Sequence, residues 1–251
     1  MHVLGKKTLS TIAAAGSLVA LAAASTAAGA QEAQKPMIPG SFSANVALTS
    51  EYYFRGVSQT DDKPAIQGGF DYEVGLSDPI NLYAGVWASN VDFNETGTIE
   101  GANIEIDWYG GLNGTIPGTE LGWDLGFVYY WYPGADSSLE YNFVEIAASL
   151  SYNFGVAEVS ASLNYSPENF GDTGDAWYSK FGVSAPVMEI VTLAAYVARQ
   201  NIADSTNYTE WNVSASVTLG GFDFSVAYTD TTLGDDDNAG PKALFTVAKS
   251  F

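Results

Sequence analysis

The stretch S-F-S-A-N-V-A-L-T-S-E-Y-Y-F-R, residues 41–55, alternates between apolar and polar side chains. One face carries Phe42, Ala44, Val46, Leu48, Tyr52 and Phe54, and the other carries Ser43, Asn45, Thr49, Glu51 and Arg55. Successive side chains of a β-strand point to opposite sides, so a period of two indicates a strand with one apolar and one polar face.

The same alternation recurs along the rest of the chain and predicts further strands. Twelve apolar faces can be counted, at residues 42–54, 66–76, 80–88, 104–112, 121–131, 144–152, 159–165, 177–185, 191–197, 211–219, 222–228 and 243–251. The number is even, as expected when both ends of a barrel wall lie on the same side of a membrane.

The connections between these segments alternate in length. Short ones lie at 77–79, 114–120, 153–155, 186–189 and 220–221, and long polar ones lie near 56–63, 90–100, 133–140, 167–175, 200–207 and 230–241. Short turns at one end and long loops at the other are typical of outer-membrane barrels. We therefore expect an all-β fold, an antiparallel up-and-down transmembrane β-barrel of about 12 strands. A soluble antiparallel β protein is the alternative, because its strands also alternate.

Aromatic residues gather near the predicted strand ends, which suggests two membrane-interface girdles. The loop end carries Tyr52, Tyr53, Phe54, Tyr129, Tyr130, Trp131, Tyr132, Tyr141, Phe143, Trp177, Tyr178, Tyr208, Trp211 and Tyr228. The turn end carries Phe42, Tyr152, Phe154, Phe222 and Phe251.

The N-terminus has the three-part layout of a secretory signal peptide. Lys6 and Lys7 precede an apolar run from Leu9 to Ala24, and Ala28-Gly29-Ala30 forms an A-x-A cleavage pattern before Gln31. The run is too short and too rich in Ala to be a membrane anchor. We expect residues 1–30 to be a signal peptide, 31–40 a short periplasmic segment and 41–251 the outer-membrane barrel.

Composition excludes several classes of function. The formal net charge is −20, with 29 acidic against 9 basic residues, which argues against nucleic acid as a partner. There is no Cys, and the one His, His2, lies in the predicted signal peptide. The mature chain therefore lacks the residues of Ser-His hydrolases and of ordinary zinc sites, and we expect no enzyme, no cofactor and no metal site. The acidic run Asp235-Asp236-Asp237 is interpreted as a solvated loop rather than a calcium site.

The polar faces of the strands predict the lining of the barrel. The candidate pore-lining residues are Glu51, Arg55, Asp71, Glu73, Glu105, Asp107, Asp124, Glu145, Lys180 and Glu210, with Glu158 and Asp223 on the same face. Because acids outnumber bases, the lining favours cations. Arg55 is expected to face wall acids such as Glu51 or Glu105 and to narrow the entrance. A plugged interior in which acids and bases pair is the alternative, because about 12 strands lie between a filled and an open barrel.

One segment resembles a known family. S-E-Y-Y-F-R-G-V-S-Q-T-D-D-K-P-A-I-Q-G-G-F-D-Y-E, residues 50–73, is similar to the signature of the TorF-type porin family of proteobacterial outer-membrane proteins. L-Y-A-G-V-W-A-S-N-V, residues 82–91, and the ending Lys249-Ser250-Phe251 also resemble that family. The resemblance implies an outer-membrane barrel with a pore in a Gram-negative cell. It implies neither a substrate nor catalytic residues.

Together these patterns predict a porin-like channel of the cell outer membrane for passive diffusion of small solutes, with a preference for cations. The alternative is a non-conducting barrel that acts as a receptor or structural protein through its extracellular loops. The expected partners are outer-membrane lipid, small solutes or cations, and the barrel-assembly machinery, which would engage the C-terminal strand ending at Phe251. The sequence does not determine the solute, whether the lumen is open or plugged, the oligomeric state or the role of R-G-V-S-Q.

The first prediction concerns processing. The chain recovered from the outer-membrane fraction should begin at Gln31, because signal peptidase cleaves after small residues in an A-x-A pattern. N-terminal sequencing of that fraction measures this directly. An intact Met1, or recovery of the chain from the soluble periplasm, would contradict the prediction.

Overall fold

The computed structural model describes residues 38–93, 100–234 and 238–251. The predicted signal peptide, residues 1–30, lies outside the described residues, as does most of the 31–40 segment. The acidic run at 235–237 also lies outside them.

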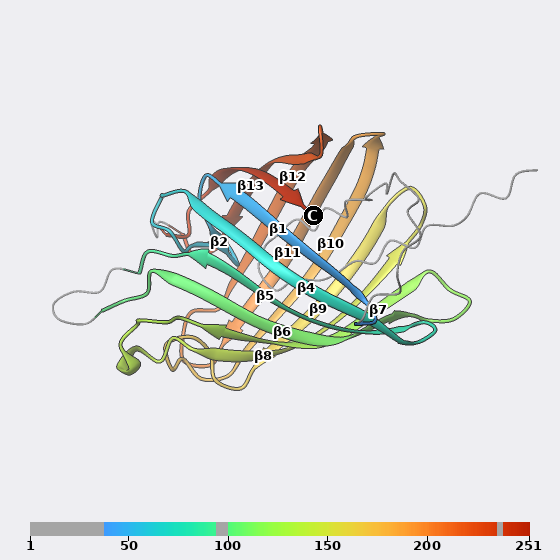
Figure 1. The fold of residues 1–251 in the computed structure, drawn as a ribbon. Helices are drawn as coiled ribbons and strands as arrows, with labels where there is room; N and C mark the ends of the chain where they lie inside the picture. Colours follow the sequence, from blue (N-terminus) through green and yellow to red (C-terminus); the bar gives the residue numbers. More distant parts are fainter. Residues whose placement is uncertain (1–37, 94–99, 235–237) are drawn as a thin grey trace, which may run out of the picture.

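Twelve antiparallel strands form a closed barrel, in the order β1-β14-β13-β12-β11-β10-β9-β8-β7-β6-β5-β4 (Figure 1). The wall strands are β1 (Ser41–Thr49), β4 (Ala65–Ser77), β5 (Ile80–Asn90), β6 (Ile104–Thr115), β7 (Leu121–Trp131), β8 (Phe143–Asn153), β9 (Glu158–Ser166), β10 (Ala176–Met188), β11 (Val191–Ile202), β12 (Tyr208–Leu219), β13 (Phe222–Thr231) and β14 (Lys242–Ser250). One short 3-10 helix, η1 (Ser137–Leu139), lies in the β7–β8 connection. The predicted up-and-down barrel and its strand count are confirmed.

The barrel closes where its first and last strands meet. β1 pairs with β14 in a register that sets Asn45 opposite Ser250 and Thr49 opposite Thr246. The ladder extends to the last residue, because the Phe251 N–H donates to the Ala44 carbonyl oxygen at 2.8 Å. Closure leaves no sheet edge with unpaired backbone groups, which a barrel needs if its wall contacts lipid.

The turn end is built from tight hairpins. The β12–β13 turn consists of Gly220 and Gly221, whose φ angles are +63° and +78°. Positive φ at both central residues belongs to a type I′ turn, whose twist matches that of paired strands. The other end carries the longer connections, which bring the loop residues of the candidate site together.

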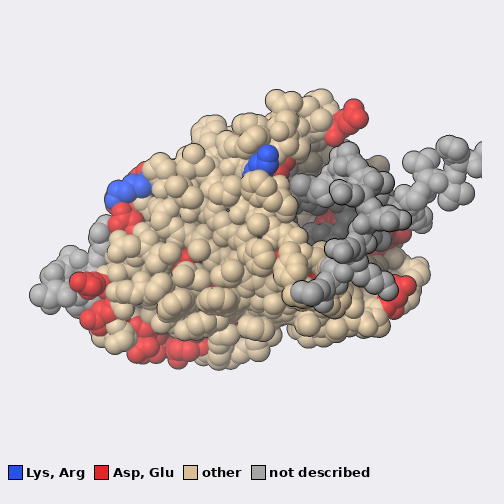
Figure 2. All heavy atoms as spheres, in the orientation of Figure 1, with Lys and Arg blue, Asp and Glu red and all other residues tan. Residues whose placement is uncertain are grey.

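The outer surface is an apolar belt. Outward residues of every wall strand are exposed, such as Ile66 at 67% and Val213 at 58%. Figure 2 shows that Asp and Glu gather at the two ends of the barrel while the wall between them is almost uncharged. Such a belt matches the lipid-facing surface of transmembrane barrels. Among the described residues, no helix is long and apolar enough to cross a membrane.

The predicted aromatic girdle at the loop end is only half right. Tyr129, Trp131, Trp177 and Tyr228 are exposed on the outer wall, as expected. The members that point into the barrel and are buried are Tyr52, Tyr53, Tyr130, Tyr132, Phe143, Tyr178 and Tyr208. Tyr130, Phe143, Tyr178 and Tyr208 are on wall strands, where alternation directs them inward, whereas Tyr52, Tyr53 and Tyr132 lie outside the wall strands. At the turn end, Phe42, Tyr152, Phe154, Phe222 and Phe251 are all exposed.

The two sides of the lumen are filled differently. On the β5–β8 side, Tyr83, Trp87, Tyr109 and Tyr130 belong to one buried aromatic cluster. Glycines make room for these rings, since a Cβ at Gly85 would lie 2.5 Å from the Tyr109 ring. On the β9–β14 side many inward residues are small, apart from larger ones such as Lys180 and Tyr196, and a cavity lies there. This lining includes Ser160, Gly182, Ser184, Ala194, Ser214, Ser225, Ala227, Thr246 and Ala248.

The first wall strand is shorter than expected. β1 ends at Thr49, whereas the alternation predicted a strand through Phe54. Residues 50–64 instead turn into the barrel and contain a small hairpin, β2 (Tyr53–Phe54) and β3 (Val57–Ser58). A hairpin inside the lumen has the same period of two as a wall strand, so periodicity alone does not distinguish them.

The fold predicts how the wall tolerates charge. Val213→Arg places a cation at the middle of β12 on the apolar belt and should lower the free energy of unfolding in lipid vesicles by about 2–4 kcal/mol. Ser137→Arg, in exposed η1, is the control and should have no such effect. Guanidinium titration of vesicle-inserted protein measures both. Equal stability of Val213→Arg and the parent protein would show that this belt does not face lipid.

Candidate functional site

A two-residue hairpin turn lies inside the barrel. Tyr53 pairs with Ser58 and Phe54 pairs with Val57. The turn residues are Arg55 and Gly56, with φ angles of +50° and +78°, which is the left-handed conformation of a type I′ turn. Gly56 lies against the wall, because a Cβ at this position would be 2.3 Å from Thr231 Cγ2. We call residues 53–58 the lumen hairpin.

Arg55, at the tip of the lumen hairpin, reaches the opposite wall. Its Nη2 donates to Glu145 Oε2 on β8 at 2.6 Å, and its Nη1 donates to Gln200 Oε1 on β11 at 3.1 Å. The Tyr208 hydroxyl on β12 donates to the Arg55 carbonyl oxygen at 3.0 Å. Contacts to three wall strands fix the tip across the lumen.

Aromatic rings enclose the Arg55 guanidinium. Its carbon lies 4.7 Å from the centre of the Phe54 ring and 4.1 Å from the centre of the Tyr178 ring. A cation over the face of an aromatic ring is stabilised by the ring's negative face, and more so when water is excluded. Burial alone would lower the pKa of Arg55, but the neighbouring Glu145 carboxylate outweighs this and raises the pKa. Arg55 therefore carries its charge throughout the physiological range.

Glu145 holds the other half of this ion pair and has further donors. It is 1% exposed. Besides Arg55, Glu145 Oε2 accepts hydrogen bonds from the Tyr130 hydroxyl at 3.2 Å and from Asn164 Nδ2 at 3.1 Å. A buried carboxylate needs a paired cation and several donors, and this one has both.

The base of the lumen hairpin is tied to the barrel by a second acid. Glu51 accepts from the Ser58 hydroxyl at 2.5 Å and from the Asp62 N–H at 3.2 Å. Its other oxygen lies 3.5 Å from Lys242 Nζ on β14. The Tyr52 hydroxyl donates to Glu105 Oε1 on β6 at 3.3 Å. Both the tip and the base of the hairpin are therefore anchored.

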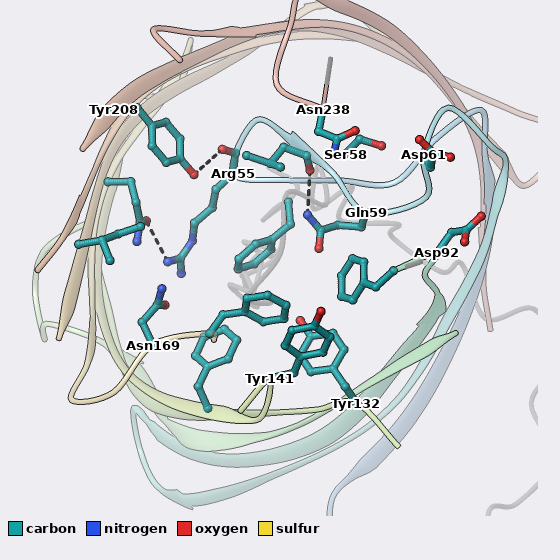
Figure 3. A pocket seen from close by; sticks show the side chains of 17 residues that line it. Arg55, Ser58, Gln59, Asp61, Asp92, Tyr132, Tyr141, Asn169, Tyr208 and Asn238 are labelled. Atoms are coloured by element: carbon teal, nitrogen blue, oxygen red, sulfur yellow. Dashed lines mark hydrogen bonds between the residues drawn. The ribbon is translucent and has the colours of Figure 1, made fainter. Parts of the chain in front are cut away.

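The lumen hairpin separates two cavities. The loop-side cavity, of about 490 Å³, is lined by Phe54, Arg55, Val57 and Ser58 together with loop residues (Figure 3). The turn-side cavity, of about 280 Å³, is lined by Glu51, Tyr52, Tyr53 and Gly56 together with inward residues of the wall. Since opposite faces of one hairpin line the two spaces, this hairpin is the barrier between them.

All ten residues predicted to line the pore point into the barrel, but they have different surroundings. Five gather around the hairpin and its anchors: Glu51, Arg55, Glu105, Glu145 and Glu210, the last of which accepts from the Tyr178 hydroxyl at 2.5 Å. Asp107 is buried on the same strand as Glu105. Lys180 lies apart, lining the turn-side cavity with its Nζ 5.4 Å from the Tyr196 ring centre.

The remaining three acids belong to the filled side of the lumen. Asp71 accepts from the Tyr109 hydroxyl, Glu73 accepts from Asn113 Nδ2 at 3.2 Å, and Asp124 accepts from the Tyr83 hydroxyl at 3.0 Å. These acids hold tyrosines and amides in place and do not reach the hairpin. Arg55 does face a wall acid, but the acid is Glu145 rather than Glu51 or Glu105, because the hairpin carries the Arg55 side chain to β8.

Some residues of the site were not expected from the sequence. Gln200, Tyr178 and Tyr208 all contact Arg55. The sequence places Tyr178 and Tyr208 in the outer girdle, but Tyr178 alternates with the exposed Trp177 on β10, and Tyr208 has the opposite parity to the exposed Val213 on β12. Within the described ranges, no group of three or more His, Cys, Asp or Glu side chains is placed to hold a metal ion.

The fold and the site together define a twelve-stranded barrel with a hairpin anchored across its lumen. The chain belongs to the Gcw_chp family, described as "Bacterial protein of unknown function (Gcw_chp)", and the match covers residues 32–251. No curated protein matches the chain. The TorF-type resemblance is not tested by this membership and stays a prediction.

Solved structures with a similar fold are outer-membrane proteins. The COG4313 outer membrane channel from Pseudomonas putida F1 has a TM-score of 0.56 and 11% identity, over 89% of this chain and 100% of that chain. A KdgM porin has a TM-score of 0.53 and 6% identity, over 83% of this chain and 98% of that chain. At such low identity, the likeness establishes the barrel fold alone.

The site predicts a strong dependence on the Arg55–Glu145 pair. Arg55→Met leaves Glu145 buried without its cation and should lower the free energy of unfolding by about 3–5 kcal/mol. Arg55→Met combined with Glu145→Gln removes both charges and should recover most of that loss. Arg199→Met, which removes an exposed Arg from the outer wall, is the matched control. Guanidinium unfolding in vesicles measures all three, and additive losses in the double variant would contradict a coupled pair.

Proposed function

We propose that this protein is a narrow outer-membrane channel for passive diffusion of small solutes, with the lumen hairpin as its constriction. The observation that carries the proposal is the pair of cavities, about 490 and 280 Å³, on opposite faces of that hairpin. A barrel with a purely structural role would have no need of open space on both sides of its centre. The channel and porin among the proteins of similar fold support the same reading.

Location in the outer membrane follows from the same features. The closed barrel with its apolar belt can contact lipid without exposing unpaired backbone groups. The predicted signal peptide, residues 1–30, would deliver the chain across the inner membrane. The C-terminal strand, ending on the exposed Phe251, would engage the barrel-assembly machinery. A TorF-type porin assignment is compatible with each of these features.

The proposed channel prefers cations. The turn-side cavity is lined by the acids Glu51, Glu158 and Asp223 and by one cation, Lys180. At the loop-side cavity the acids Asp61 and Asp92 share one cation, Lys63, while Arg55 is paired with Glu145, so acids outnumber bases there too. Acidic linings raise the local concentration of cations and lower that of anions. We propose no catalytic role, since the chain after His2 has neither His nor Cys.

One observation favours the alternative function. The hairpin is anchored at its tip and its base by buried contacts, and the β5–β8 side of the lumen is filled by aromatic rings. A barrel closed in this way could act through its loops as a receptor or structural protein. The two functions differ in one measurable property, which is whether ions cross the barrel.

Conductance across a planar bilayer tests the proposal. The wild-type protein should conduct under a KCl gradient with a reversal potential of the sign set by K⁺. That preference should weaken between 0.15 M and 1 M salt, because the Debye length falls from about 8 Å to about 3 Å. Arg55→Ala should raise both conductance and cation preference, because it removes a positive charge and volume from the constriction.

One control variant and two contrary outcomes make the test decisive. Arg199→Ala removes the same charge from the outer wall and should leave conductance and selectivity unchanged. Protein that conducts but prefers chloride would overturn the acidic-channel claim. Protein that folds and inserts but never conducts would favour the receptor or structural function.

A further inference from the structure

The loop-side cavity has two chemically different walls. One wall consists of aromatic rings, from Phe54, Phe93, Tyr141 and Phe170. The other kind of lining consists of side-chain amides, from Gln59, Asn169 and Gln200, which border the rings from more than one side; in Figure 3 Asn169 lies to the lower left of the rings and Gln59 to their upper right. A ligand that fits must therefore have an apolar face and a polar edge.

The aromatic wall is rigid and partly open. Phe54, Phe93, Tyr141 and Phe170 are half-buried, so part of each ring borders the cavity. Tyr141 and Phe170 are stacked with ring centres 4.3 Å apart, and Phe93 meets Phe170 edge-on at 5.7 Å. Behind them, the buried Tyr132 ring packs edge-on against Phe170 at 5.4 Å. Rings held in this way lose little freedom when a ligand stacks on them.

Each of these three amides is oriented by one hydrogen bond within the protein, and its other polar atom is left for a ligand. Gln200 Oε1 accepts from Arg55, Gln59 Nε2 donates to the Val57 carbonyl oxygen at 3.0 Å, and Asn169 Nδ2 donates to the Thr173 hydroxyl at 3.1 Å. Among the described residues, the Gln200 amide nitrogen and the Gln59 and Asn169 amide oxygens have no partner. Gln200 is only 3% exposed as a residue and its side chain lines the cavity. The wall therefore offers one donor and two acceptors, a mixture that suits hydroxyl groups.

The charged groups around the cavity each already have a partner of opposite sign. Arg55 is paired with Glu145, and Lys63 at the rim is bonded to Asp92 and lies 3.5 Å from Asp61. A charged ligand would have to displace one of these pairs, whereas a neutral ligand would not. The cavity volume, about 490 Å³, lies in the range of small-molecule sites.

We propose that the loop-side cavity is a binding site for a neutral saccharide, mono- or disaccharide in size, with its C–H face on the Tyr141–Phe170 wall and its hydroxyls on the amides. A pyranose ring has the required form, because its axial C–H groups make an apolar face while its hydroxyls, each both donor and acceptor, point outward around the rim. An aromatic solute would use the ring wall but leave the three amide groups unpaired. The inference deepens the proposed channel function by naming its solute class. Passage of the sugar rests on that function, whereas binding does not.

Isothermal titration of the full barrel in detergent tests the site without requiring conduction. D-glucose, maltose and cellobiose are the probes, with glycerol and phenol as comparison compounds that lack either the ring face or the hydroxyl rim. At least one of the three sugars should bind measurably better than glycerol and phenol. Phe170→Leu should weaken that binding about ten-fold, as expected for loss of one stacking contact of about 1.4 kcal/mol.

Matched variants show whether the loss of sugar binding comes from the aromatic face of Phe170. Phe170→Trp keeps an aromatic face and should preserve binding. Phe154→Leu removes an exposed Phe at the turn end and should have no effect. Heat-dependent migration on gels verifies that each variant is folded, and Tyr141→Leu replaces Phe170→Leu if the latter does not fold.

The outcomes are distinct. No binding of any sugar, or phenol binding in preference to all three, would overturn the saccharide site. Sugar binding unaffected by Phe170→Leu and Tyr141→Leu would place the sugar elsewhere and overturn it too. Sugar binding by a barrel that never conducts would overturn the channel proposal and leave the site standing.

Discussion

The ion pair between Arg55 and Glu145 sets the arrangement of the lumen. Both side chains are almost wholly inside the protein, with relative exposures of 7% and 1%, so neither charge can be left without the other. The pair joins the tip of the lumen hairpin to β8 on the opposite wall. Because the tip is fixed there, Phe54 and Ser58 line one cavity and Tyr53 and Gly56 line the other. Without this ion pair, the tip of the hairpin would lose its strongest contact with the opposite wall.

The unequal filling of the lumen follows from the size of the inward residues. Tyrosines on β5 and β6, Tyr83 and Tyr109, lie over glycines of neighbouring strands and donate to acids, so that half is solid. The β9–β14 half has many Ser, Ala and Gly residues among its inward positions and holds the turn-side cavity. The path that the proposed channel offers is therefore off-centre, between the hairpin and the wall of small residues. Acids on that path, rather than those on the solid side, would set its selectivity.

The sequence predicts the wall strands and the residues that point inward, but it does not predict the hairpin inside the lumen. Period-two alternation and alternating loop lengths predicted the barrel and its strand count, because these patterns are imposed by lipid outside and water or polar groups inside. The alternation of apolar and polar residues continues through Tyr52 and Phe54 into the hairpin. The alternation therefore does not show where the wall strand ends and the lumen hairpin begins. Gly56 is the available sequence signal, since type I′ turns favour Gly at their second central residue, but Arg55 is not a residue that such turns favour at the first. The partnership with Glu145 joins residues far apart in sequence, and only the closed barrel brings them together.

Disulfide trapping at the hairpin tip tests its position most directly. The chain has no native Cys, so any disulfide in Gly56→Cys/Thr231→Cys must join the two introduced residues. The backbone of Gly56 lies close enough to Thr231 that a Cβ would meet its side chain at 2.3 Å. With the hairpin across the lumen, mild oxidation of the folded barrel should link the two cysteines within one chain, as read from the peptides by mass spectrometry. Two free cysteines that both react with a thiol reagent in the folded protein would contradict the account.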